Sequence, residues 1–160
     1  LVEHEGWREI DLATLAGAAA EATLARLGVE GPATIVLLAT SDEAVAQLNA
    51  EFRGRPSPTN VLSWPAQPLA PPAPGRAPQP PVRDAAGDME LGDIALAYET
   101  CAQEAERGDI PLTDHAAHLV VHAILHLLGY DHICDEDAGL MERLESEILR
   151  ALGVPDPYAR

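Results

Sequence analysis

Residues His115–His132 read HAAHLVVHAILHLLGYDH, and this stretch determines how we interpret the rest of the chain. Five of the six histidines lie in it, and four of them follow one another at steps of three, four and four residues. At about 100° per residue, such steps place side chains in one stripe on an α-helix. The apolar residues on the other faces are Leu119, Val120, Ile124, Leu127 and Leu128. We therefore predict a largely buried helix whose histidine stripe needs polar partners.

The last three histidines have the spacing of a metal site. His122 and His126 are four residues apart, Gly129 ends the helix, and His132 follows the turn as H-x-x-x-H-x-x-G-x-x-H. Two imidazoles at i and i+4 can bind one zinc ion, and a third after the turn leaves the fourth tetrahedral position open. An i, i+4 pair alone also occurs on ordinary helices, but the third histidine favours a catalytic metal site. Three imidazoles also suit nickel, copper or iron.

Neighbouring residues have less specific roles. We expect His115 and His118 to lie behind the ligands, or to face solvent or substrate near the helix start. Cys134 is close enough in sequence to approach the metal, but a packed thiol is the better interpretation. Asp131 either orients His132 or caps the last helix, and the sequence leaves both open.

The same histidine spacing occurs in the metzincin peptidases, with one difference. Those enzymes have a glutamate as general base after the first histidine, whereas this chain has Ala123. Alanine cannot accept a proton, so peptide hydrolysis by that route is disfavoured. Tyr130, Asp131 or Asp93 would have to supply any acid–base catalysis.

The pattern around this stretch predicts one α/β (α+β) domain over residues 1–160. We expect a small mixed four-stranded sheet packed with about five helices, and the metal site on a central helix. Asp11 or Thr14 caps the first helix, and Thr113 caps the histidine helix. The predicted helices are Leu12–Leu27, Ser41 to the stop at Gly54, Glu99–Arg107, Thr113–Leu128 and Glu136–Leu152, and the predicted strands are Thr34–Ala39, Val61–Trp64 and Glu90–Tyr98.

Length and composition restrict the class of protein. A chain of 160 residues fits a single compact domain. No apolar run reaches the roughly 18 residues that a membrane-spanning helix needs, and residues 1–10 have no signal-peptide pattern. The two cysteines are expected to be free thiols in a reducing compartment. We therefore expect a cytoplasmic protein.

The formal net charge of −16 argues against a protein that coats nucleic acid, because phosphate binding normally requires a basic surface. All ten basic residues are arginines. Any contact with RNA must therefore depend on a few local arginines, and Arg53 and Arg55 are the candidates.

Residues Ala66–Asp88 differ in composition from both flanks. Seven prolines lie in this segment among Ala, Gln and Gly. Prolines lack the N–H donor that helices and sheets require, so we predict a flexible proline-rich loop that interrupts the domain. A linker between two domains is disfavoured, because neither flank has enough apolar residues for its own core.

Several motifs together resemble the YbeY family of bacterial endoribonucleases. The histidine stretch from His122 to His132 carries the resemblance, with Ala123 where the family usually has Gly. Phe52–Arg55 and Pro58–Pro65 are also similar, with Trp64 where Phe is common. Leu91–Ile94 and the tail around Ala151–Tyr158 complete the match. The proline-rich segment is longer than is usual for the family.

The resemblance implies a zinc-dependent endoribonuclease specific for single-stranded RNA, with one Zn²⁺ per chain. It implies a role in 16S ribosomal RNA 3′-end maturation and ribosome quality control. The partners would be precursor ribosomal RNA and the small ribosomal subunit or its assembly proteins, with no DNA and no membrane. It also implies that Arg53 is essential and near the metal, where a guanidinium suits phosphate. Residue chemistry alone leaves Arg53 between a surface role and a functional one.

Two other interpretations remain open. A metallopeptidase is favoured by the histidine spacing and opposed by Ala123. A non-catalytic assembly factor, in which zinc stabilises the fold, is opposed by the open fourth position. Asp93 follows Gly92 and is interpreted as a turn residue rather than a hydrogen-bond partner of a ligating imidazole.

Overall fold

A three-stranded mixed sheet lies at the centre of the computed structural model. The model describes residues 1–53 and 59–159, and for Phe52 and Arg53 it describes only the backbone. The strand order is β1–β3–β2. β3 (Glu90–Ala97) is the middle strand, parallel to β1 (Thr34–Thr40) and antiparallel to β2 (Val61–Pro65). β3 is the most deeply buried strand, and its residues Ile94–Ala97 are all in the core.

The prediction of a fourth strand is wrong for the described residues. The chain start lies along the outer edge of β1, where the Glu3 and Ala39 amides donate to backbone carbonyls across the gap. Only Val2 forms a bridge there, with Ala39. At Glu5 the chain turns into a 3-10 helix (η1, Glu5–Glu9), which the buried Trp7 fixes by donating from Nε1 to the Thr40 carbonyl at 3.1 Å. The paired run is therefore too short to form a strand.

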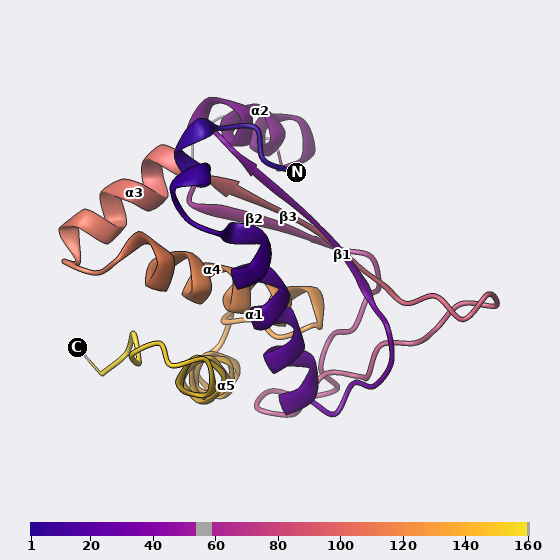
Figure 1. The fold of residues 1–160 in the computed structure, drawn as a ribbon. Coiled ribbons are helices and arrows are strands. Elements are labelled where there is room, and N and C mark those ends of the chain that lie inside the picture. The colour runs from indigo at the N-terminus through magenta and orange to yellow at the C-terminus, as the bar shows by residue number, and fades with distance from the viewer. Residues whose placement is uncertain (54–58, 160) are drawn as a thin grey trace.

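Helices cover both faces of the sheet, as Figure 1 shows. α2 (Asp42–Arg53) packs on one face against a small cluster built on Val45, Leu62 and Ala95. The main core lies on the other face, between the sheet, α1 (Leu12–Arg26) and α4 (Leu112–Leu127). α5 (Asp135–Ala151) packs against α1 and α4. α3 (Tyr98–Arg107) continues from β3 and contacts α4. The single α/β domain with five α-helices in its described part is as predicted.

α4 is the central helix because its apolar residues face the sheet, α1 and α5 at once. Nine of its sixteen residues are buried, and the half-buried histidine stripe occupies the remaining face. The prediction that Thr113 caps this helix is wrong. Pro111 takes the N-cap position with extended backbone, and its carbonyl accepts from the His115 amide at 3.1 Å. Pro111 also keeps Ile110 out of the helical region, so the helix begins directly after Pro111.

The starts of α2 and α3 hold each other in place where the parallel strands β1 and β3 end. The Asp42 carboxylate accepts from the Thr100 amide at 2.9 Å and from the Thr100 hydroxyl at 2.7 Å. Glu99 in turn accepts from the Asp42 amide at 3.0 Å. Each helix thus accepts a hydrogen bond from a backbone N–H in the first turn of the other helix. Such an N–H has no acceptor within its own helix. α1 has its own cap, Asp11, which accepts from the Thr14 hydroxyl at 2.7 Å.

Residues 66–88 form neither helix nor strand, as predicted from their prolines. Several contacts tie the segment to the domain. Gln67 pairs with the Val82 backbone, Asp137 of α5 accepts from the Gly75 amide, and Arg83 donates to the carbonyls of Glu30 and Pro32. Its flexibility stays a prediction.

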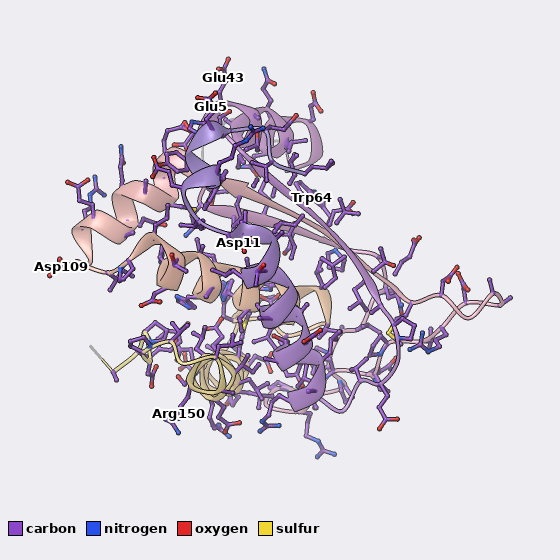
Figure 2. All side chains as sticks on the ribbon, viewed as in Figure 1. Glu5, Asp11, Glu43, Trp64, Asp109 and Arg150 are labelled. Carbon is purple, nitrogen blue, oxygen red and sulfur yellow. The ribbon has the colours of Figure 1, made fainter. Side chains whose placement is uncertain are left out.

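The charged side chains of Glu43 and Arg150 point outward, as Figure 2 shows. Within the described residues, no helix has the length and apolar character needed to cross a membrane.

Candidate metal centre

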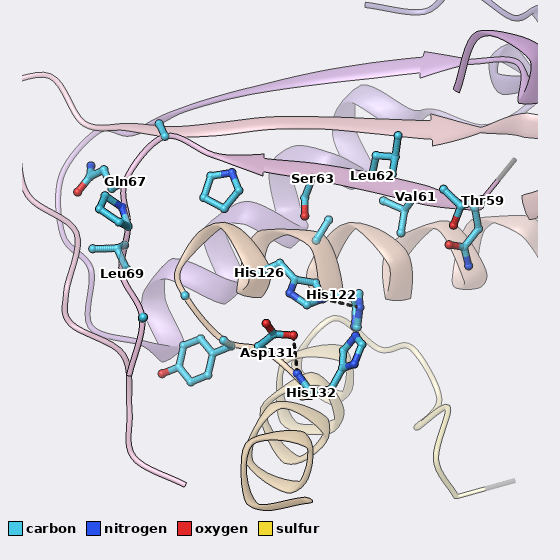
Figure 3. A pocket seen from close by; sticks show the side chains of 18 residues that line it. Thr59, Val61, Leu62, Ser63, Gln67, Leu69, His122, His126, Asp131 and His132 are labelled. Atoms are coloured by element: carbon cyan, nitrogen blue, oxygen red, sulfur yellow. Dashed lines mark hydrogen bonds between the residues drawn. The ribbon is translucent and has the colours of Figure 1, made fainter. Parts of the chain in front are cut away.

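His122, His126 and His132 meet at the carboxyl-terminal end of α4. Each offers one ring nitrogen, and the three nitrogens lie within 4.8 Å of one another. The Nε2 atoms of His122 and His126 are 3.0 Å apart. Two nitrogens bound at 2.0–2.1 Å to one tetrahedral zinc would be separated by about 3.3 Å, so the observed spacing fits a metal ion. Figure 3 shows the three rings gathered in this way.

The turn after α4 brings His132 back to the helix. Gly129 has a φ of 96°, a left-handed conformation that favours glycine. The amides of Gly129 and Tyr130 donate to the carbonyls of His126 and Leu125, both at 3.0 Å, and so close the helix end. The Asp131 carboxylate then accepts from the backbone amide of His132 at 2.7 Å.

Asp131 therefore fixes the backbone that carries His132 rather than its ring. It does not cap α5 either, because Cys134 takes that N-cap position. Cys134 and Cys101 are both free thiols. Among the described residues, neither belongs to the cluster of three histidines that could bind a metal ion.

Glu145 of α5 is a site residue that the sequence analysis missed. Its side chain is fully buried, and one carboxylate oxygen is within hydrogen-bonding distance of Nδ1 of His122. The other oxygen lies 3.4 Å from Nε2 of His118 and accepts from the Tyr158 hydroxyl. The available signal is the buried face of α5, where Met141, Leu144 and Ile148 frame this one acidic residue. His118 lies behind the ligand His122, which is one of the positions expected for it.

His115 belongs to a separate contact. Its Nε2 lies 3.0 Å from Oε1 of Glu104, and the same carboxylate accepts from the Asn60 side-chain amide at 3.0 Å. Asn60 lines the groove described below. His115 thus supports a groove residue instead of the three clustered histidines.

Charge and burial set the protonation of two groups. Burial, followed by the neighbouring His122, lowers the pKa of His126 to about 4, so its imidazole is neutral near pH 7. Burial would raise the pKa of Glu145, but hydrogen bonds from His118, His122 and Tyr158 outweigh it and lower the pKa to about 2. A neutral imidazole is the form that binds a metal.

A groove of about 790 Å³ lies over the three histidines (Figure 3). β2 and residues 66–70 line it opposite the end of α4. Among its described lining residues, Asp131 is the one charged side chain apart from the histidines. The full lining is Thr59–Ser63, Pro65–Ala70, His122, Ala123, His126 and Gly129–His132.

The structure does not bring Asp93 to the histidines. Asp93 is exposed on β3, opposite Trp64 of β2, and lines a smaller apolar pocket with Val36 and Leu48. The prediction that Asp93 is a turn residue is wrong. β3 has a bulge between Glu90 and Gly92 and then continues through Asp93. Arg53 is the last residue of α2, and its side chain lies outside the described atoms. Arg55 lies outside the described residues.

Comparisons with known proteins identify the family of this chain. A family model described as "Endoribonuclease YbeY" matches residues 2–153. A protein of that name from Jannaschia sp. (strain CCS1) is 52% identical over 159 residues, covering 99% of this chain and 97% of the relative. Another from Ruegeria pomeroyi is 54% identical over 148 residues, covering 92% and 90%.

The fold also matches a solved structure. The solution structure of TM1509 from Thermotoga maritima aligns with a TM-score of 0.54, covers 100% of this chain and 96% of that one, and has 20% sequence identity. At that identity the likeness concerns the fold alone. The family model and the close relatives together show that this chain belongs to the YbeY family.

Proposed function

We propose that the protein is a zinc-dependent endoribonuclease that cuts single-stranded RNA in 16S ribosomal RNA 3′-end maturation and ribosome quality control. It would act in the cytoplasm on precursor RNA, with the small ribosomal subunit or its assembly proteins as partners. The observation that carries the proposal is the cluster of three imidazole nitrogens at the floor of a groove, in a chain whose relatives are named endoribonucleases. The strand specificity and the ribosomal target rest on the family resemblance.

His122, His126 and His132 would hold one Zn²⁺ per chain. Bound zinc supplies a Lewis acid for a phosphate oxygen and lowers the pKa of a bound water to about 7. The protein keeps His126 neutral by burial, so this ligand is ready near pH 7. Ala123, at the position of the metzincin base, is buried and has no group that accepts a proton. Among the described groove residues other than the histidines, Asp131 and Tyr130 are the candidates to exchange a proton there.

Arg53 would neutralise the phosphate of the bound RNA, and Arg55 would assist. The chain is strongly acidic, and the described groove lining contains no arginine. Phosphate binding normally requires positively charged side chains. Arg53 ends α2 eight residues before β2 begins, and β2 lines the groove. A planar guanidinium can bind two phosphate oxygens at once.

Two variants test these roles against labelled single-stranded RNA. His126→Ala should lose both zinc and cleavage. Arg53→Ala should keep zinc and fold but lose cleavage by about 100-fold or more, as expected for removal of one preorganised transition-state contact. Arg107→Ala, an exposed arginine on α3, is the matched control and should cleave like the wild type. Full cleavage by purified His126→Ala or Arg53→Ala would refute the corresponding role.

The charge of the molecule favours a second function, that of a non-catalytic assembly factor. An acidic surface suits basic ribosomal proteins better than bare RNA. In that case wild-type protein would bind the small subunit or its proteins without cutting RNA. Removal of zinc would then unfold the domain, because a structural metal contributes folding free energy directly. Circular dichroism with and without a chelator, beside the cleavage assay, separates the two functions.

A further inference from the structure

We propose that Glu145 is the positioning residue of the metal centre, which selects the nitrogen that His122 presents to the metal. The inference rests on the metal site of the proposed function. It starts from the burial of Glu145, whose side chain has no exposed surface. A carboxylate removed from water is costly unless donors surround it. Here the donors come from α4 and from the carboxyl-terminal tail.

The contacts define which ring nitrogen of His122 carries the proton. An ionised carboxylate can only accept, so His122 Nδ1 must donate to Glu145. In the neutral ring the other nitrogen, Nε2, then has the free lone pair. That same Nε2 faces Nε2 of His126 at 3.0 Å, inside the ligand cluster. Carboxylates that accept from the second nitrogen of a histidine ligand fix its ring and raise its basicity.

The tail closes the other side of the carboxylate. Tyr158 donates its hydroxyl to Glu145, and its ring packs edge-on against His118 with centroids 5.7 Å apart. Asp156 holds this conformation by accepting from the Tyr158 amide at 2.9 Å and the Ser146 hydroxyl at 2.8 Å. With both oxygens engaged, the carboxylate cannot rotate away from His122. α5 and the tail thereby position a ligand that α4 carries.

The ring tautomer tests this role without metal or activity. Nitrogen-15 NMR of the histidine rings, recorded on metal-free full-length protein at about pH 8, where histidine is neutral, distinguishes the two tautomers. We expect His122 to carry its proton on Nδ1 in the wild type. In Glu145→Gln, whose amide can donate to Nδ1, we expect the proton to move to Nε2. A wild-type His122 protonated on Nε2 would overturn the proposal.

Zinc affinity, measured by competition with a chromophoric chelator, tests the consequence. Glu145→Gln should bind zinc about 10- to 100-fold more weakly than the wild type, as found for lost partners of histidine ligands. Glu142→Gln, an exposed change on the same helix, should bind like the wild type. Unchanged zinc affinity in Glu145→Gln would contradict the role. If Glu145→Gln does not fold, the wild-type tautomer decides alone.

The proposed function and the positioning role of Glu145 can fail separately. If the wild type binds zinc in the Glu145-dependent way but cuts no RNA, only the proposed function fails. If the wild type binds no zinc, both the function and the positioning role are wrong.

Discussion

Gly129 is the single residue on which the histidine cluster depends most. It lies at the point where the chain leaves α4 and turns back to present His132. Its φ of 96° is strained for any residue with a Cβ. A Cβ at this position would also overlap the Leu69 carbonyl and lie 2.8 Å from Cβ of Pro78. Backbone conformation and close packing by residues 66–88 therefore both require glycine here.

Gly129→Ala should lower the free energy of unfolding by roughly 1–3 kcal/mol, the usual cost of a strained backbone position. It should also weaken zinc binding, since the turn that positions His132 must shift. Urea unfolding of the metal-free protein and zinc competition measure the two effects.

Gly17→Ala is the matched control, because that glycine lies in α1 with nothing within 4 Å of an added Cβ. It should leave zinc affinity unchanged and raise stability by up to about 1 kcal/mol. Equal behaviour of the two variants would show that the turn geometry does not support the cluster.

The first turns of α2 and α3 contact each other at the ends of the parallel strands β1 and β3. Asp42 accepts from both donors of Thr100 and thereby caps α3 from another helix. Asp42→Ala should cost about 1–2 kcal/mol of unfolding free energy, as expected for a lost N-terminal cap. Zinc affinity should stay the same, because no ligand lies on these helices.

Glu43→Ala changes the next residue in the same first turn, whose side chain is exposed. Its unfolding free energy should stay within about 0.5 kcal/mol of the wild type, which is usual for surface positions. If Asp42→Ala were no less stable than Glu43→Ala, the proposed capping contact would contribute nothing to stability.

How well the elements could be predicted depended on how local their signals are. Apolar periodicity and Gly129 predict α4 and its end because both act within a few residues. The histidine cluster was predictable for the same reason, since a helix and one turn bring its members together. Glu145 is 23 residues from His122, and only the packing of α5 on α4 joins them. In sequence it is one of 26 acidic residues, and its place on the apolar face of α5 indicates burial but not the histidine that it contacts.

The predictions for Thr113 and Asp93 are wrong because they too rest on local signals. Thr113 has the side chain of a cap, but Pro111 determines where the helix starts. Asp93 follows a glycine, as turn residues often do, but pairing with β1 and β2 keeps it in the sheet. In both cases a neighbouring constraint overrides the preference of the residue itself.

The whole domain is acidic. The described lining of its groove contains histidines and one aspartate but no arginine. Long-range electrostatics therefore does not favour RNA, and binding must depend on a few local charges. The proposed metal ion and Arg53 are those charges. The proposed cleavage of RNA thus depends first on how the metal is held.

X-ray absorption at the zinc edge, on wild-type protein loaded with one equivalent of zinc, identifies the atoms that bind the metal. We expect three imidazole nitrogens and one further light atom at about 2.0–2.1 Å, and no sulfur. A shell at about 2.3 Å would place the Cys134 thiolate on the metal and would contradict the three-histidine open site.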